Sequence, residues 1–164
     1  MKLLIIGAGG HGQVVKEVAE ALGTYERIDF VDDTAECAVG KLKDLANLRE
    51  RYDAAFVGIG NNHVRREVLT QLRACAYDIV TLVHPTAYVS KSAVIGAGTI
   101  IEPKATVNAH TKVGEGCIIS VGAIVDHDVV LESCVHVNAG AICKAGSRVE
   151  AEVKLEAGQV VKGY

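Results

Sequence analysis

The stretch that decides the fold is residues 105–135, ATVNAHTKVGEGCIISVGAIVDHDVVLESCV. An aliphatic side chain returns at every sixth position of this stretch, and the same register extends over residues 87–164. That segment contains 23 Val, Ile and Leu residues, and twelve of them fall in one register. An even spread over the six registers would put about four there. The positions in register are Val89, Ile95, Ile101, Val107, Val113, Ile119, Val125, Leu131, Val137, Cys143, Val149, Leu155 and Val161.

A small or β-branched residue precedes most of these positions by two. Side chains two apart on a strand point to the same side, so both sets are expected to face inward. Several residues directly after the aliphatic position are of types that tolerate turn or left-handed backbone. These residues are Gly96, Asn108, Gly114, Asp126 and Asn138. Each hexapeptide therefore predicts a short strand and a corner, and three of them predict a triangular coil, because neither a heptad nor an alternating strand has a period of six.

The first half of the chain has a different pattern, in which buried-strand candidates alternate with helices. Apolar runs predict strands at residues 2–6, 27–33, 54–60 and 78–83. Amphipathic stretches predict helices at residues 13–22 and 62–75. This alternation is typical of an α/β unit with a parallel sheet. We therefore expect a Rossmann-like half domain over residues 1–84 and a parallel β-helix over residues 85–164.

A glycine-rich turn follows the first predicted strand in the sequence GAGGHG. Gly7, Gly9 and Gly12 fit the dinucleotide-binding spacing, and Asp32 and Asp33 close the second strand about 20 residues on. This pattern alone favours NAD. Only about 80 residues precede the repeats, enough for one mononucleotide-binding half, so a nucleotide with a single ribose fits better.

A second glycine-containing segment, GIGNN, ends the third predicted strand. Its Gly60 and Asn61 would face the same crevice, because the carboxyl ends of parallel strands meet at one edge of the sheet. We therefore include both residues in the nucleotide site. A purely structural turn remains the alternative, since a lone glycine motif is a weak signal.

Charge, hydropathy and cysteine content exclude several classes of protein. The chain carries 17 basic and 20 acidic residues, a net charge of −3, which lacks the basic footprint of a nucleic-acid binder. No apolar run approaches the roughly 20 residues that span a membrane, and the first residues turn glycine-rich too early for a signal peptide. The five cysteines show no metal-ligand spacing. We expect a cytoplasmic protein without a metal site.

His127 stands out among the six histidines because it occupies a corner position that small residues fill elsewhere, and Asp126 and Asp128 flank it. A carboxylate beside an imidazole can fix its tautomer and stabilise the imidazolium. A plain surface histidine at a turn is the alternative. Ala145 follows His127 by one coil, which puts its backbone about 4.8 Å away along the axis. His136 follows by half a coil and is expected on the opposite side of the prism, so a site that uses both histidines needs two protomers.

The combination of GAGGHG, FVDD, GIGNN, HPTA, the hexapeptides and VDHD resembles the sialic acid O-acetyltransferase / nucleotide-sugar N-acetyltransferase family (NeuD/PglD-like). The resemblance covers nearly the whole chain. It implies a left-handed β-helix and homotrimers whose sites lie between neighbouring β-helices. Acetyl-CoA would be the acetyl donor and no metal would take part.

The same resemblance implies roles for individual residues. His127 matches the general base and Asp128 the acidic residue beside it. His136 matches a second histidine near the acetyl-CoA, and the main-chain N–H of Ala145 falls where a donor meets the thioester carbonyl. The contacts to the nucleotide part of the sugar match Gly9, Gly10, His11, Asp32 and Asp33.

The expected reaction moves an acetyl group to the amino group of a nucleotide-linked sugar, a UDP-4-amino-dideoxy sugar, for bacterial surface glycan synthesis. Two alternatives stay open, a sialic acid O-acetyltransferase and a weakly catalytic sugar-nucleotide-binding partner of another enzyme. An NAD-binding regulator is a third.

The end of the chain departs from the family pattern, because relatives usually continue for further coils and this sequence ends at Tyr164. Only roughly 10 Å of the axis lies below His127, which is short for a whole CoA arm. Lys144 and Lys162 lie on the edge that carries Asp126 and are candidates for contacts with the CoA phosphates. Merely solvated lysines are the alternative.

Overall fold

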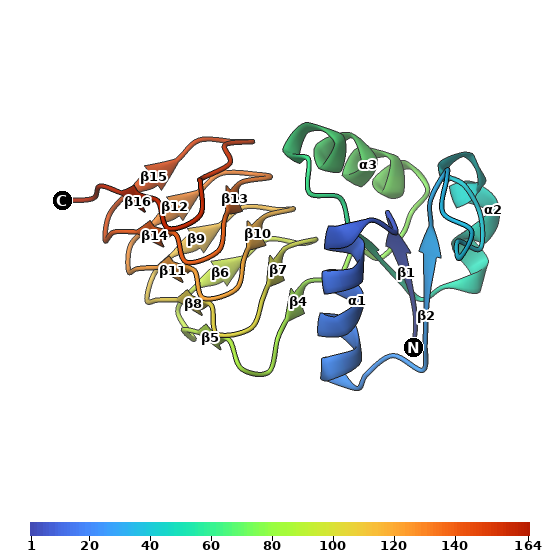
Figure 1. Ribbon diagram of the computed structural model, residues 1–164, viewed down its shortest axis with the longest axis horizontal. Helices are drawn as coiled ribbons and strands as arrows, with labels where there is room; N and C mark the ends of the chain where they lie inside the picture. The colour runs from blue at the N-terminus through green and yellow to red at the C-terminus, as the bar shows by residue number, and fades with distance from the viewer. The chain divides into compact units, whose positions relative to one another are not determined.

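A computed structural model describes all 164 residues and divides them into two compact units, Met1–Val80 and Thr81–Tyr164. Figure 1 shows the first unit with its helices and the second as a stack of short strands. The first is an α/β unit and the second a parallel β-helix, as the sequence predicts. None of the helices has both the length and the apolar composition needed to cross a bilayer.

The N-terminal unit contains a parallel sheet with the order β2-β1-β3, formed by β1 (Lys2–Ile6), β2 (Arg27–Val31) and β3 (Ala54–Val57). The central strand β1 is buried from Leu3 onward, as expected of a strand covered on both faces. The connecting helical elements are α1 (Gly10–Leu22), η1 (Leu42–Asp44), α2 (Leu45–Leu48), η2 (Arg49–Arg51) and α3 (Asn62–Ala74). The predicted strand and helix order is confirmed for α1 and α3, whereas the three short elements between β2 and β3 lack a periodic signal.

The glycines of GAGGHG allow β1, α1 and β3 to approach one another closely. Gly7 has φ +101°, which an L side chain rarely adopts. A Cβ built on Gly12 would lie 2.0 Å from the Gly7 carbonyl oxygen, and one built on Gly58 would lie 2.8 Å from the Gly12 Cα. These glycines therefore have a packing role at the carboxyl edge of the sheet.

The second unit winds through three parallel sheets, with the orders β13-β10-β7-β4, β16-β14-β11-β8-β5 and β15-β12-β9-β6. Each strand pairs with the strand one coil away, as Ile118 pairs with both Ile100 and His136. The spacing of 18 residues in these pairs confirms the triangular coil. The strands are β4 (Leu82–Val83), β5 (Tyr88–Val89), β6 (Val94–Ile95), β7 (Ile100–Ile101), β8 (Thr106–Val107), β9 (Lys112–Val113), β10 (Ile118–Ile119), β11 (Ile124–Val125), β12 (Val130–Leu131), β13 (His136–Val137), β14 (Ile142–Cys143), β15 (Arg148–Val149) and β16 (Val160–Val161).

The core of the prism consists of the predicted inward pairs. Val125 and Ala123, two residues apart, are both fully buried, as are Val137 and Val135. No aromatic ring belongs to this core. Small side chains therefore fill the narrow interior, consistent with the composition of the repeats.

The corners follow the aliphatic positions as predicted, and the left-handed backbone lies two residues after a Gly, Asn or Asp that begins a corner. Positive φ occurs at the second corner residue, as at His110 (+59°) and Asp128 (+58°), and not directly after the aliphatic position. Gly96 is needed there for space, because a Cβ on it would lie 2.5 Å from the Glu115 backbone nitrogen. The Asn and Asp residues at that position accept hydrogen bonds from the next residue instead.

The segment 78–83, predicted as one strand of the N-terminal domain, is divided between two sheets. Ile79 bridges Ala55 of β3, whereas Leu82 and Val83 form β4 and pair with Ile100 and Ile101. The compact units consequently divide between Val80 and Thr81, four residues before the boundary expected from the linker-like HPT sequence.

Candidate active site

His127 and Asp128 form a hydrogen-bonded pair at the corner that follows β11. The His127 Nδ1 lies 2.7 Å from the Asp128 Oδ2, and both side chains are about half exposed. This hydrogen bond is the main cause that raises the pKa of His127 above its usual value of 6.5, with the charges of Asp126 and Asp128 adding to it. When Nδ1–H donates to the carboxylate, Nε2 is free to accept a proton. The pair is therefore arranged as a general base with its orienting acid.

Asp126 and Asn108 fix the backbone of the same corner through hydrogen bonds. The Asp126 Oδ1 accepts the backbone N–H of His127 at 2.8 Å and the Asn108 Nδ2 at 3.1 Å. The N–H of His127 is the largest cause that lowers the pKa of Asp126. Asn108 was not predicted, although its position one coil before Asp126 could have indicated it.

Ala145 lies one coil after His127 on the same edge, as the repeat arithmetic predicts. The next residue, Gly146, donates its N–H to the His127 carbonyl at 3.1 Å, which joins the two coils. Lys144 and Lys162 are exposed on the neighbouring column of that edge.

Tyr164 is a further residue beside His127, and sequence reasoning missed it. Its ring centroid lies 6.3 Å from that of His127, and a Cβ on Gly146 would meet the tyrosine ring at 2.0 Å. The absence of a side chain at Gly146 thus lets an aromatic ring cover this side of the corner.

A cavity of about 370 Å³ lies at the carboxyl edge of the N-terminal sheet. Its lining consists of Gly7, Gly9, Gly10, His11, Asp32, Asp33, Leu42, Gly58, Ile59 and Gly60. Gly9 caps α1 without a side-chain hydrogen bond, and a Cβ on Gly9 or Gly10 would meet nothing within 4 Å. The first N–H groups of α1 are therefore open toward the cavity edge, an arrangement that suits an anionic phosphate.

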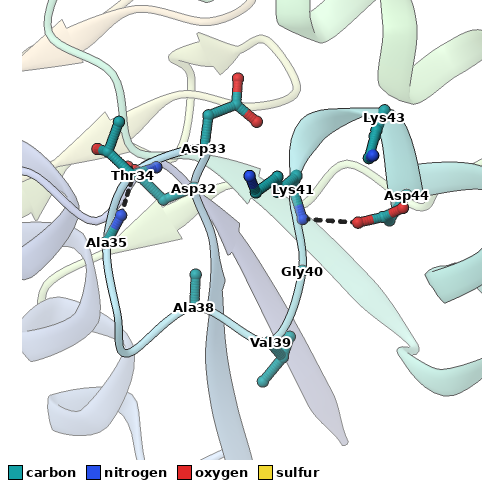
Figure 2. A pocket seen from close by; sticks show the side chains of 10 residues that line it. All are labelled: Asp32, Asp33, Thr34, Ala35, Ala38, Val39, Gly40, Lys41, Lys43 and Asp44. Atoms are coloured by element: carbon teal, nitrogen blue, oxygen red, sulfur yellow. Dashed lines mark hydrogen bonds between the residues drawn. The ribbon is translucent and has the colours of Figure 1, made fainter.

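Asp32 and Asp33 differ in what their carboxylates do (Figure 2). Both oxygens of Asp32 accept protein donors, which are the backbone N–H groups of Ala8, Thr34 and Ala35 and the Thr34 hydroxyl. The backbone donors Ala8 and Thr34 are the main causes that lower the pKa of Asp32 to about 2. Asp32 thus ties the glycine-rich turn to the loop after β2.

The Asp33 carboxylate accepts a single protein hydrogen bond. Its Oδ1 accepts the Leu42 N–H at 3.0 Å, and the side chain points away from the turn that Asp32 closes. Asp33 also borders a second cavity of about 580 Å³, together with Lys41 and Lys43. A carboxylate and two ammonium groups at one cavity can bind the donor and acceptor groups of a nucleotide base or the ribose hydroxyls.

His11 and Asn61 depart from simple ligand roles. Burial, with the Arg65 charge second, lowers the pKa of His11 to about 4, so its ring is neutral at ordinary pH. The Asn61 side chain caps α3 by accepting the Val64 N–H at 3.1 Å. Gly60 lines the cavity, but Asn61 does not.

Comparisons with known proteins place this chain among acetyltransferases. The family model "PglD N-terminal domain" matches residues 2–72. The acetyltransferase domain of PglB from Neisseria gonorrhoeae FA1090, solved with acetyl coenzyme A, is 37% identical with a TM-score of 0.96. That match covers 99% of this chain and 82% of the other. The chain belongs to the PglD-like nucleotide-sugar acetyltransferase family. The resemblance inferred from the motifs is thereby confirmed.

Two further members of the PglD-like family match over large parts of the chain. A mutant of perosamine N-acetyltransferase from Caulobacter crescentus, in complex with CoA and GDP-perosamine, is 30% identical, with a TM-score of 0.90 over 99% of this chain and 89% of its own. The UDP-N-acetylbacillosamine N-acetyltransferase of Bacillus subtilis (strain 168) is 39% identical over 106 residues, 59% of this chain. The aligned segment spans about half the length of this curated relative.

His136 lies apart from His127 within one chain. His136 lies on β13, in the four-stranded sheet that starts with β4, whereas His127 follows β11 of the five-stranded sheet. The His136 Nε2 lies 3.0 Å from the Ser120 Oγ, and both residues are buried. The structure therefore brings His127, Asp128 and Ala145 together but not His136. Ser120, 16 residues before its partner, follows no motif that we recognised.

Proposed function

We propose that this chain transfers the acetyl group of acetyl-CoA to the amino group of a nucleotide-linked sugar. The observation that carries this proposal is the His127–Asp128 pair, placed one coil above the Ala145 backbone. Such an arrangement combines a base, its orienting acid and a backbone donor on a single edge. Membership of the PglD-like family supports it independently.

The reaction is a direct transfer. The sugar amine attacks the thioester carbonyl, and the His127 Nε2 takes a proton from the attacking nitrogen while Asp128 stabilises the imidazolium. The N–H of Ala145 stabilises the oxyanion. The attack forms the C–N bond, and the collapse of the oxyanion breaks the C–S bond while the CoA sulfur takes the proton that His127 holds. No covalent enzyme intermediate is required.

The N-terminal cavity supplies the nucleotide specificity in this proposal. The open first turn of α1 at Gly9, Gly10 and His11 receives phosphate, and Asp33 binds the base or ribose. We favour a UDP-linked 4-amino-dideoxy sugar as the acceptor, because the Bacillus subtilis relative is named for a UDP sugar. The name of the Caulobacter crescentus ligand makes GDP-linked sugars the first competitor.

The acetyl-CoA lies along the edge of the prism that carries His127, and Lys144 and Lys162 are the candidates to meet its phosphates. Both ammonium groups are exposed on this edge. Because acetyl-CoA and nucleotide sugars are cytoplasmic metabolites, we place the reaction there and assign the product to surface glycan synthesis.

We further propose a homotrimer in which each site lies between two β-helices. One outward column of the five-stranded sheet exposes apolar side chains, with Tyr88 57%, Ile124 41% and Val160 48% exposed. A partner protomer that covers this column removes them from water. His136 lies on a different sheet from the strand that precedes His127, and we expect it to border the site of a neighbour.

The test is a panel of acceptors assayed for thiol release from acetyl-CoA. UDP-amino and GDP-amino sugars are compared with sialic acids. Release with an amino sugar nucleotide supports the proposal, whereas release with sialic acids alone replaces it by an O-acetyltransferase. Specific nucleotide-sugar binding without any thiol release would make the chain a binding partner, and tight NADH binding at GAGGHG would favour a regulator.

A further inference from the structure

One column of residues lies on the prism edge that carries His127 and Ala145, and each of its members directly precedes the residue at that corner. It consists of Ser90, Asn108, Asp126, Lys144 and Lys162, one from each coil. Within it, the Asn108 Oδ1 accepts the Ala109 N–H and the Asp126 Oδ1 accepts the His127 N–H, both at 2.8 Å. The 3.1 Å bond from the Asn108 Nδ2 to Asp126 links the two coils. We call Asn108 and Asp126 the Asx ladder.

The Asx ladder stops at the next coil, where Lys144 takes the place of an Asn or Asp. A lysine side chain carries donors and no acceptor, so it cannot bind the N–H that follows it. The N–H groups of Lys144, Gly146 and Tyr164 all have backbone acceptors. The N–H of Ala145 has no hydrogen-bond acceptor in the structure.

An Asn or Asp side chain accepts the N–H of the next residue at another edge of the prism as well, so this hydrogen bond depends on residue type. At a different corner of the prism, the Asn138 Oδ1 accepts the Ala139 N–H, again at 2.8 Å. An Asn directly before the corner residue therefore closes the corner N–H wherever it occurs in this chain. An Asn at position 144 would be expected to do the same to Ala145.

Resting on the proposed function, we propose that position 144 sets which coil can bind the acyl oxygen. Asp126 accepts the N–H of His127 at the level of the base. Lys144 has no acceptor for the N–H of Ala145 one coil below, so that N–H is left for the substrate. The first open N–H below the base on this edge is then that of Ala145, so the thioester oxygen binds there and the carbonyl carbon is held below the His127 ring. Lys144 is on this basis a positioning residue that acts through the Ala145 backbone, in addition to any contact with phosphate.

The state of the Ala145 N–H can be tested without any activity. The full-length protein labelled with ¹⁵N-alanine reports the exchange of this amide against Ala109 and Ala139, whose N–H groups are capped. Ala145 is expected to exchange at least about tenfold faster than either, and the variant Lys144→Asn should slow it by a similar factor. An Ala145 amide that is already as slow as Ala109, or that Lys144→Asn leaves unchanged, would overturn the proposal.

The catalytic consequence is tested by comparing two substitutions that remove the same charge. Lys144→Asn offers an acceptor and Lys144→Ala does not, so kcat should be at least about tenfold lower in the former, while any shared change in KM for acetyl-CoA reports the lost ammonium. Equal kcat values would contradict the proposal.

Deletion of the donor itself provides a second measurement. Ala145→Pro removes the N–H, and Pro85 and Pro103 show that this corner position accepts proline. The expected loss in kcat is about 10²-fold. The matched control is Ala97→Pro at an exposed corner elsewhere, which should keep wild-type kcat. If wild-type protein releases no thiol with any acceptor, the proposed function fails, and the amide exchange result decides on the ladder separately.

Discussion

At the scale of single residues, the chemistry depends on two consecutive side chains that both project outward from one corner. In a regular strand neighbouring residues point to opposite sides. The positive φ of Asp128 breaks that alternation and brings its carboxylate to the His127 ring. Asp is one of the few residue types that tolerate this backbone, so a single corner can hold a base together with its acid.

Replacement of His127 tests the base directly. His127→Ala is expected to lower kcat by about 10²–10⁴-fold, because proton removal from the attacking amine loses its acceptor. The measurement is thiol release at saturating acetyl-CoA. A rate within a few-fold of wild type would remove His127 from the mechanism, and circular dichroism of the variant serves as the folding control.

The pH profile tests the Asp128 hydrogen bond. The base must be neutral to act, so kcat/KM should fall as pH drops through the raised pKa of His127, with a midpoint above 6.5. Asp128→Asn keeps the tolerated left-handed backbone but removes the charge, so the midpoint should move to lower pH. Asp128→Gly is the matched control for the backbone, and an unshifted acid limb in both variants would contradict the assignment.

The repeat register led to His127, Asp128 and Ala145 because an 18-residue coil fixes which residues share an edge. It could not separate Asp32 from Asp33, since the two differ only in the direction of their carboxylates. Asn108 and Ser120 were missed for a related reason. Their hydrogen bonds to Asp126 and His136 depend on the directions of the side chains, which residue spacing alone does not give.

At the scale of elements, the half-buried carboxylate of Asp32 fixes the loop after β2, and the exposed carboxylate of Asp33 is the one that we propose to bind the nucleotide. Asp32 accepts four hydrogen bonds, three from Thr34 and Ala35 within this loop and one from the Ala8 N–H in the turn before α1. The two segments that line the nucleotide cavity are therefore held in a fixed relation by a single side chain.

Paired substitutions separate these roles. Asp32→Asn turns an amide toward backbone donors and should destabilise the fold by about 1 kcal/mol, at the low end because the carboxylate is only partly buried. It should also weaken nucleotide-sugar binding. Asp33→Asn retains the oxygen that accepts from Leu42 and should weaken binding with an unchanged melting temperature. Thermal unfolding and titration calorimetry measure the two effects.

The same Asp32 interaction predicts a dependence of stability on pH. The folded-state pKa of about 2 lies below the usual 3.8, so the stabilising effect is complete above pH 3.8 and is lost as pH falls toward 2. In Asp32→Asn the melting temperature should therefore fall less steeply as the pH drops below 3.8. Equal acid limbs in wild type and variant would show that the loop does not depend on this carboxylate.

Element boundaries were harder to predict where one apolar run serves two sheets. DIVTLV has the hydrophobicity of a single strand, yet Ile79 and Leu82 pair in different units. Hydropathy reports burial and does not identify the partner strand, so the division could only come from the structure.

At the scale of the whole molecule, mixed trimers test whether a site draws on two chains. His127→Ala and His136→Ala protomers are each expected to be inactive as pure trimers. When the two variants are unfolded and refolded together in equal amounts, a site is intact if its His127 comes from a His136→Ala chain and its His136 from a His127→Ala chain. About a quarter of the sites should therefore recover activity. The control mixes each variant with itself.

No recovery in mixtures of verified trimers would mean that no site takes His127 from one chain and His136 from another. Assembly itself is checked by Ile124→Asp, which places a charge in the exposed apolar column and should reduce the sedimentation coefficient to that of a monomer. A variant that still sediments as a trimer would show that another face forms the contact.

The 18-residue coil also makes spacing a functional property of the sequence. A single residue added between His127 and Ala145 would turn the donor off the edge, and six would carry it to the next face of the prism. An extra 18 would return it to the same edge but one level too far from the base. Between these two positions the protein should therefore tolerate substitutions far better than insertions or deletions.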